Sequence, residues 1–454
     1  MKNILKNKKN INARGFAGII ALLTVCSLVL ILTFSLSASL FAKKQISRNL
    51  SNSLKSYYLA ESGTEDAIVR VLKNYNYILG ENIFTLDGST IDQNISKSGN
   101  TTTIDVSSSY LNNVRKLTSS LTVTTTEVSF YYGVQVGEGG LTMGNSGTSV
   151  VGNIYSNGAV TGNGSLITGD AIVANGMALS GIVVKGNVNA NSIVSSKICG
   201  DAYYQNIDAT SLNFLNSPIS PTCSLPLTSG TAHPGSPDMP IETMPITIDT
   251  IRSWEEDAEA GGVYSDAAHC NPQVNISIGP AKLNCNLTGA NGIKITLTGT
   301  LWVNGNIILP NNVIVELSSG YGDDSGVIIA DNIGNETVNG VITTSNNAII
   351  CGSNGYNSGS GTCNASNETY IMFLSTHSGA TNAINISNNA LGAIFYAFAG
   401  IANVANNASI KEVTAYKLNL ANNTTVTYES GLENATFSSG PGGGWEIISW
   451  NETE

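Results

Sequence analysis

The sequence repeats itself in the segments GNIYSNG (152–158), GDAIVANG (169–176) and GNVNANS (186–192). The glycines that open these segments are spaced 17 residues apart. A short fixed period with Gly and Asn punctuation predicts a β-solenoid, in which each rung holds about three short strands and three tight turns. Asn and Gly suit the turns because they tolerate positive φ.

The composition agrees with this prediction. Only 12 % of the 454 residues are charged, whereas 42 % are hydrophobic and 47 are Gly. A narrow core of inward Val, Ile, Leu and Ala requires few charges. This balance excludes a disordered chain and is atypical of a cytosolic enzyme. The fold class is therefore mainly β, with repeats over 138–216; a β-sandwich is the alternative.

A connector and a short helix are expected over 217–262. Seven of the 11 prolines fall between 218 and 245, which indicates an extended linker. The segment that follows predicts one helix, capped by Thr247 or Asp249 and ended by Gly261. We expect this helix to cover the open end of the solenoid, where an exposed strand edge would otherwise pair with other chains.

A second solenoid region is predicted over 263–440. Asn-Asn pairs recur at 388–389, 406–407 and 422–423, so the spacing of about 17 residues returns. In general style these repeats resemble bactofilin-like and other surface β-helix proteins. The tail, 441–454, is expected to form a final strand or cap on the solenoid.

Toward the N-terminus, residues 81–137 predict a small antiparallel sheet. The segment LTVTTTEVSFYYGVQV (121–136) is rich in β-branched and aromatic residues, and TTTIDV (101–106) is similar. We expect this sheet to cradle the end of a long helix.

That helix is predicted over 16–80, after a basic leader of residues 1–15. Residues 15–42 contain no charge, which is long enough to cross a bilayer. A secretory signal peptide has a shorter apolar region, so we expect a retained single-pass anchor.

Residues 1–55 hold nine Lys and Arg and no acid, which leaves 12 basic against 32 acidic residues in the remainder. This acidic excess excludes nucleic acid as a partner of the large part and suggests that the basic end meets membrane lipid.

The cysteines indicate an oxidising compartment. Cys26 lies in the apolar run, and six others follow it. The candidate disulfide cysteines are Cys199, Cys223, Cys270, Cys285, Cys351 and Cys363. Nearest-neighbour pairing is one of 15 connectivities, and six free thiols in a cytosolic protein are the alternative. No CxxC motif supports a zinc site.

Residues 12–75 resemble the N-terminal region of PilX-type minor pilins, the type IV pilus assembly family. The resemblance rests on the basic leader, the sequence Arg14-Gly15-Phe16, the apolar helix and the segment YYLAESG (57–63). It implies cleavage of a leader between Gly15 and Phe16 by a prepilin peptidase, and packing of the helix against other pilin-like subunits. Ile20 departs from the pattern, since it stands where major pilins carry Glu.

Catalysis is not expected. Residues 263–440 contain no Arg and few other basic groups, and no G-x-S-x-G, Walker A or HExxH motif occurs. The densest acidic set is Glu316, Asp323, Asp324 and Asp331, without a partner Arg in that region. We therefore predict no enzyme activity, no catalytic residues, no cofactor and no metal.

The sequence thus predicts a membrane-anchored structural protein whose large C-terminal part lies outside the cytoplasm, at the cell surface or in a pilus. The solenoid would serve adhesion or pilus assembly, with membrane lipid, pilin-like subunits and surface glycans as partners and no nucleic acid. A surface polysaccharide-binding or polysaccharide-cleaving β-helix enzyme is one alternative. A bactofilin-like polymerising scaffold is the other.

Overall fold

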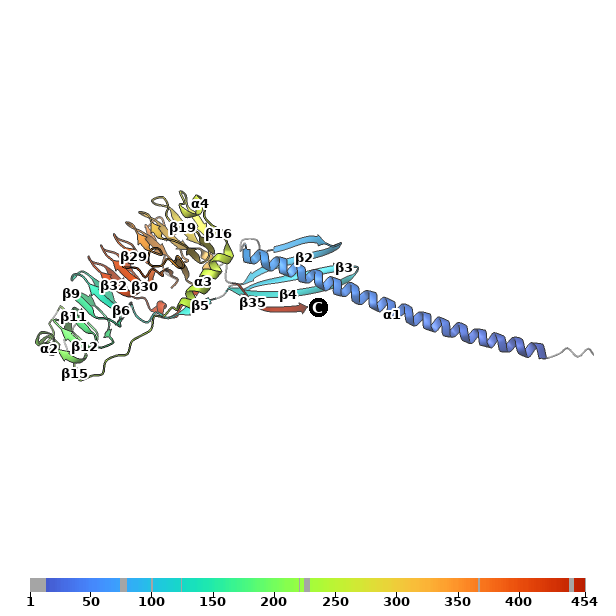
Figure 1. The fold of residues 1–454 in the computed structure, drawn as a ribbon, viewed down its shortest axis with the longest axis horizontal. Coiled ribbons are helices and arrows are strands. Elements are labelled where there is room, and N and C mark those ends of the chain that lie inside the picture. The colour runs from blue at the N-terminus through green and yellow to red at the C-terminus, as the bar shows by residue number, and fades with distance from the viewer. Residues whose placement is uncertain are drawn as a thin grey trace, which may run out of the picture.

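The computed structural model describes residues 14–73, 80–98, 101–123, 125–219, 221–223, 229–365, 368–440 and 445–453. It has three parts: a long N-terminal helix, a small antiparallel sheet on the second half of that helix, and a larger body of short parallel strands (Figure 1). A long apolar helix followed by mostly β structure agrees with the predicted fold class. Predictions for residues 1–13 and 74–79 lie outside the described residues.

The N-terminal sheet has five antiparallel strands against helix α1 (Arg14–Lys73). The strands, in spatial order, are β1 (Gly80–Leu86), β2 (Ser89–Ser98), β3 (Thr101–Tyr110), β4 (Asn113–Val123) and β35 (Trp445–Thr453). Strand β35 pairs with β4, with Ile447 opposite Leu121. The expectation that the tail extends or caps the solenoid is therefore wrong. The tail returns to the first sheet and supplies its edge strand.

Small residues let α1 lie close to this sheet. Ala60, Thr64 and Ala67 are fully buried there. A Cβ added at Gly63 would lie 2.7 Å from Ile91 Cγ2, which is closer than such atoms approach. The same glycine offers its carbonyl to Gln93 Nε2 at 2.6 Å. The helix is thus held by steric fit and by a buried hydrogen bond.

We expect Gly63→Val to destabilise this sheet by about 1–3 kcal/mol, because the added side chain overpacks a filled core. Trp450 packs against the same core, so its fluorescence during urea unfolding reports the change. The control is Gly18→Val on the same helix, where nothing lies within 4 Å of an added Cβ. Equal stability of the two variants would contradict the close packing.

The parallel-stranded body, residues 134–427, is organised around three ladders. The first ladder follows the spatial order β16 (Val263–Tyr264), β18 (Ala281–Leu283), β20 (Leu301–Val303), β23 (Gly326–Ala330), β28 (Ile371–Ser375), β30 (Ile394–Val404), β32 (Glu412–Leu420), β6 (Val134–Met143), β8 (Ile154–Ser156), β10 (Ala171–Val173), β12 (Val188–Val194), β14 (Ala202–Ile207) and β15 (Ala232–Pro234). Every pairing in it is parallel.

The second ladder runs through β21 (Ile307–Leu309), β24 (Ile342–Thr344), β29 (Asn382–Ile386), the second halves of β30, β32 and β6, β9 (Val160–Ile167), β11 (Ala178–Val184) and β12. The third contains β17 (Ile276–Ile278), β19 (Lys294–Leu297), β22 (Ile314–Leu317), β25 (Ile349–Cys351), β31 (Ser409–Ile410), β33 (Thr425–Thr427), β7 (Ser149–Val151), the second halves of β9 and β11, and β13 (Lys197–Ile198). Inward Val, Ile and Leu of all three ladders form one core.

The remaining elements lie outside the ladders. They are β5 (Thr125–Val128), β26 (Tyr356–Asn357), β27 (Thr362–Cys363), β34 (Ala435–Ser438), the helices α2 (Ala209–Asn216), α3 (Ile248–Gly261) and α4 (Ala267–Cys270), and two 3₁₀ turns, η2 (Ser319–Tyr321) and η3 (Ser430–Asn434).

The pairing register matches the period of the sequence repeat. Ala171 pairs with Ile154 on one side and with Val188 on the other, each 17 residues away. Each repeat therefore places the same position above its predecessor. Such parallel pairing differs from the antiparallel sheets of a β-sandwich.

The strands are not stacked in chain order. The chain enters the body at β6, in the middle of the first ladder, and proceeds to β15 at one end. It crosses back outside the ladders, re-enters at β16 at the opposite end, and winds inward until β32 pairs with β6. At this seam Val413 lies opposite Val134, and Leu418 opposite Leu141. The two predicted repeat regions thus meet in one stack.

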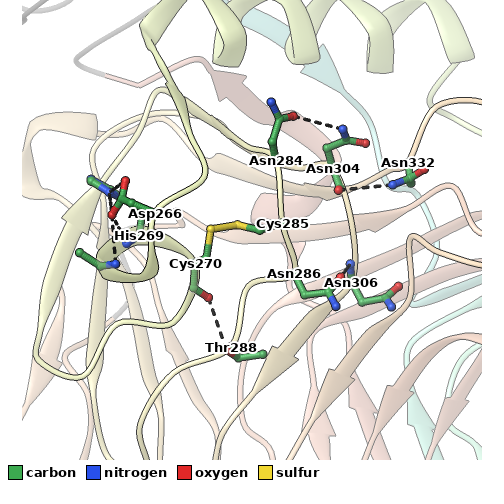
Figure 2. The surroundings of a disulfide bond; sticks show 11 residues. Asp266, His269, Cys270, Asn284, Cys285, Asn286, Thr288, Asn304, Asn306 and Asn332 are labelled. Carbon is green, nitrogen blue, oxygen red and sulfur yellow. Dashed lines mark hydrogen bonds and ion pairs between the residues drawn. A yellow bond between two sulfur atoms is a disulfide. The ribbon is translucent and has the colours of Figure 1, made fainter.

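Asparagines stabilise the turns between strands. Asn312, Asn347 and Asn389 adopt positive φ, which Asn tolerates better than most residues. The Nδ2 of Asn347 donates to Asn312 Oδ1 at 3.0 Å, and the Nδ2 of Asn389 donates to Asn347 Oδ1 at 3.2 Å. Similar contacts join Asn304 to Asn284 (Figure 2). The abundance of Asn therefore follows from the stacked turns.

Three disulfides join the neighbouring cysteines in sequence. They are Cys199–Cys223, Cys270–Cys285 and Cys351–Cys363. The second ties α4 to the segment after β18, at the β16 end of the stack (Figure 2). The first lies at the opposite end, near α2, where Leu215 is buried in the core. Both ends of the stack are thus covalently tied.

Helix α3 lies along the outer face of the first ladder. Of the two predicted caps, Thr247 and Asp249, it is Thr247 that caps the helix, and its side chain accepts from Thr250 N. Its Trp254 packs in a lateral cluster with Trp302, Met372 and Phe437. The expectation that this helix covers the open end of the solenoid is wrong, because outward apolar residues on the ladder give it a side face to bury.

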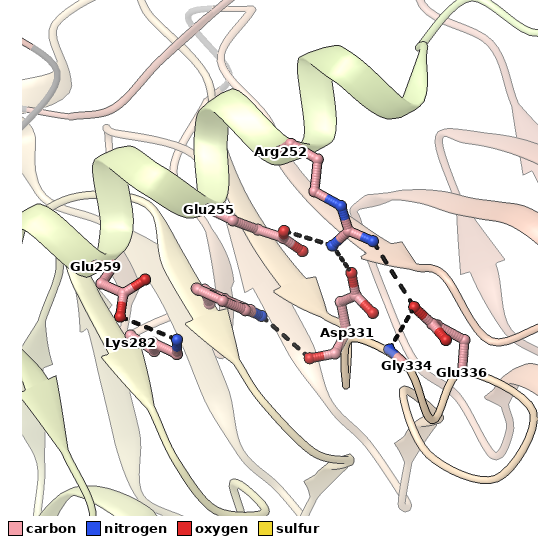
Figure 3. Close-up of polar contacts among 8 residues, drawn as sticks. Arg252, Glu255, Glu259, Lys282, Asp331, Gly334 and Glu336 are labelled. Carbon is pink, nitrogen blue, oxygen red and sulfur yellow. Dashed lines mark hydrogen bonds and ion pairs between the residues drawn. The ribbon is translucent and has the colours of Figure 1, made fainter.

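A charged cluster fastens α3 to the ladder (Figure 3). Arg252 Nη1 donates to Glu255 Oε2 at 2.6 Å and also to Asp331 Oδ2, and its Nη2 lies 3.7 Å from Glu336 Oε1. Asp331 is fully buried, and Glu255 is 2 % exposed. The guanidinium of Arg252 therefore hydrogen-bonds two buried carboxyl groups.

We expect the stability of this contact to depend on pH through Glu255. Burial, with a further contribution from Asp331, raises the pKa of Glu255 from 4.5 to about 8. The folded state therefore binds this proton more tightly than the unfolded state, and the stability is full below pH 4.5 and declines as the pH rises toward 8. Glu255→Gln should remove that decline, measured as the urea unfolding free energy across this pH range. If the unfolding free energy of the wild type and of Glu255→Gln changed equally with pH, Glu255 would not be the group responsible.

Candidate functional site

The first half of α1 is an apolar helix without partners among the described residues. From Phe16 to Phe41 its large hydrophobic side chains are exposed; Phe16 is 70 % and Phe41 72 % exposed. In the described part of the chain this is the one helix long and apolar enough to cross a membrane. Figure 1 shows it projecting beyond the sheet and away from the body. Such a surface is unfavourable in water and requires lipid or protein around it.

Basic residues mark the end of the apolar stretch. Lys43, Lys44 and Arg48 follow it within two turns, and all three are exposed. Long basic side chains at this position can extend to the polar surface of a bilayer. The sheet begins to contact the helix one turn later, where Arg115 Nε donates to Ser53 Oγ at 2.8 Å and Lys55 Nζ lies 2.6 Å from Asp87 Oδ2.

An apolar stripe continues beyond these basic residues. Ile46, Leu50, Leu54 and Tyr58 recur every four residues on one face of α1, and each is at least 49 % exposed. Leu50, Leu54 and Tyr58 line a shallow hollow beside Asp87. Among the described residues, the helix therefore has two apolar surfaces without a partner: the stretch from Phe16 to Phe41, and the stripe from Ile46 to Tyr58.

The predicted processing residues lie at the start of the helix. Gly15 is in its first turn and Phe16 follows it, so the Gly15–Phe16 bond is helical in the full chain. Cys26 is exposed and free on the apolar stretch. Among the described residues no group of three or more His, Cys, Asp and Glu could hold a metal ion.

The sequence did not predict two of the side-chain contacts described above, one in the first sheet and one on α3. The C-terminal strand β35 closes the sheet, and Glu452 on it accepts from Arg115 Nη1 at 2.6 Å. The alternation in WEIISWNET (445–453) was a signal for a strand, but nothing local identifies β4 as its partner. The second is the partner of Asp331, which is Arg252 from the helix before the second repeat region.

No protein-family model and no curated protein matches this sequence. Among solved structures, a crystal structure of the competence-associated pilin ComZ from Thermus thermophilus is similar, at 10 % sequence identity and a TM-score of 0.32. The match covers 88 % of this chain and 97 % of that chain.

Proposed function

We propose that this protein is a membrane-anchored structural protein of pilin-like organisation, which displays its parallel-stranded body outside the cytoplasm for adhesion or pilus assembly. The observation that carries the proposal is the division of α1. Its first half is apolar and exposed, while one face of its second half packs on a sheet formed by later residues of the chain. One helix thus joins an anchor to a folded external part.

The PilX-type resemblance supports the finer form of this proposal. The segment 57–63 contains Ala60 and Gly63, the small residues that let the helix approach the sheet. The exposed stripe from Ile46 to Tyr58 is a surface for the helix of another pilin-like subunit. Cleavage before Phe16 would leave the apolar helix at the mature N-terminus.

We propose that the body is a β-solenoid. We also propose that it is the part of the protein that binds external partners. Parallel pairing at a spacing of 17 residues supports this fold. Three disulfides favour an oxidising space over a cytoplasmic scaffold. Membrane lipid, pilin-like subunits and surface glycans are the proposed partners. The body would bind and would not catalyse, and nucleic acid would not be a partner.

Mass spectrometry of the native protein, with and without reduction, tests the processing and export. We expect a mature N-terminus at Phe16 and three disulfides. An intact Met1 together with free thiols at all six candidate disulfide cysteines would contradict the proposal and favour the cytoplasmic scaffold.

Membrane fractionation tests the anchor. Leu28→Lys with Leu32→Lys should release the protein from the membrane, because each Lys near the centre of the span costs about 3 kcal/mol. The matched control is Ser47→Lys with Ser51→Lys, which lies beyond the apolar stretch on the same helix. Retention of the Leu28 and Leu32 double variant in the membrane would refute an anchoring role.

A further inference from the structure

A hollow of about 410 Å³ lies on the outside of the third ladder, between β25 and β31. Pockets of roughly 300–1,000 Å³ are typical of sites for small molecules. Its wall includes Leu391, Ser409, Lys411, Glu429 and Asn364. It lies between the two tied ends, close to the seam, because β31 in its wall pairs with β33, and β33 pairs with β7.

The hollow arises because the third ladder lacks a regular strand at this rung. Leu391 forms isolated bridges to Ile349 and Ser409, and the chain then passes through Gly392 at φ 88° and Ala393 at φ 66°. A Cβ at Gly392 would lie 2.2 Å from the Ile350 carbonyl oxygen, so the backbone runs very close to the previous rung. Positive φ at a non-glycine residue costs energy and is found preferentially at functional sites.

Part of the wall comes from a short hairpin that several contacts hold in place. Strands β26 and β27 form it, and the Cys351–Cys363 disulfide ties it to β25. Asn364 Nδ2 donates to the Asn354 carbonyl at 2.7 Å, and Tyr356 N donates to Glu316 Oε2 at 2.9 Å. Because this wall is fixed before any ligand arrives, binding would cost little ordering entropy.

The polar groups of the hollow are balanced in charge. Lys411 and Glu429 form an ion pair in which each side chain is about one third exposed (34 % and 30 %). Tyr370 OH donates to Glu429 Oε2 at 3.1 Å and orients that carboxylate. Ser409 adds a hydroxyl, and Leu391, which is 38 % exposed, adds an apolar surface.

We propose that this hollow binds one uncharged sugar unit of a surface glycan. The ammonium and carboxylate groups would contact neighbouring hydroxyls, and Leu391 would contact the apolar face of the ring. A ligand with net charge fits less well, because Lys411 and Glu429 already neutralise one another. The inference rests on the proposed function, in which the body meets glycans, and gives that contact a location and a chemical class.

The test uses the full chain in detergent, with disaccharides of glucose, galactose and N-acetylglucosamine, and glucuronate as the charged probe. Saturation-transfer NMR and titration calorimetry should detect at least one neutral probe with a Kd on the order of 1 mM, and glucuronate more weakly. Absence of binding by every neutral probe, or preferential binding of glucuronate, would overturn the inference.

Two variants locate the site. Ser409→Trp should fill the hollow and weaken binding about tenfold or more. Its matched control is Ser149→Trp, because Ser409, Thr425 and Ser149 stack in register on one ladder and Ser149 is outside the hollow. Glu429→Gln keeps the shape and should also weaken binding. Equal affinity of the Ser409 and Ser149 variants, or unchanged affinity of Glu429→Gln, would refute the site.

Fractionation of the same proteins separates this inference from the anchoring proposal. Loss of sugar binding with intact membrane association would contradict only the sugar-binding inference. Sugar binding by a protein that is not retained in membranes would contradict only the anchoring proposal.

Discussion

Arg252→Met should lower the free energy of unfolding of the α3 region by about 3–5 kcal/mol at neutral pH. The substitution keeps the aliphatic bulk but leaves the fully buried Asp331 without its cationic partner. Asp331 Oδ1 has no hydrogen-bond partner among the described residues, so the charge of this carboxylate depends on Arg252. Trp254, which follows Arg252 by two residues and packs in the lateral cluster, reports the unfolding by fluorescence.

Arg70→Met is the matched control for this prediction. Arg70 also forms an ion pair with an Asp at 2.6 Å, but both side chains are more than one third exposed. Exposed pairs contribute about 0–1 kcal/mol. If the two variants were destabilised equally, the burial of Asp331 would not be the source of the effect.

Removing the Cys270–Cys285 bridge by a double substitution with Ser should cost about 3 kcal/mol, as expected for a closed loop of 15 residues. The loss should be concentrated at the β16 end of the stack, where the bridge ties α4 to the first ladder. Hydrogen exchange of residues 263–285, together with urea unfolding, measures both the size and the place of the effect.

Cys26→Ser provides the comparison, because Cys26 is exposed and free. It should leave the unfolding curve of the body unchanged. Reduction of the wild-type protein should reproduce the exchange pattern of the double variant at 263–285. Uniform exchange along the whole stack would show instead that the bridge does not act locally.

Local patterns were enough to predict the elements that depend on near neighbours. The uncharged run at residues 15–42 predicted the helix, and the glycines of the repeat predicted a 17-residue offset that the register of Ala171 with Val188 reproduces. The cap was narrowed to Thr247 or Asp249, of which Thr247 is found, because capping involves residues three positions apart.

Long-range pairing was not predictable in the same way. The seam between β32 and β6 joins residues about 280 positions apart, and the sequence of either strand would suit many parallel partners. The same applies to β35, whose partner lies more than 300 residues earlier. An arginine partner for Asp331 was sought only within residues 263–440, which contain no Arg. The partner is Arg252, which lies on α3 before that region.

The candidate sugar site was missed for a related reason. Lys411, Glu429 and Tyr370 are separated by 18 to 59 residues and converge only when the rungs stack. Gly392 and Ala393 gave no signal of a gap in the ladder, since Gly-Ala occurs widely in the repeats.

The path of the chain also determines how mechanical tension would pass from an attached surface to the anchor. Two adjacent strands, β5 and β34, connect the body to the first sheet, and they continue into β4 and β35, which are themselves paired. A pull on the body would therefore be shared by two tethers, and would load the first sheet along its strands, where many hydrogen bonds resist together. Along the chain β5 leads to the seam strand β6, but β34 is also bonded beside β23, where Ser325 N donates to the Thr436 carbonyl. Force would enter at the seam and at β23, so the strands at the β15 end would stay unloaded while the protein is held under tension.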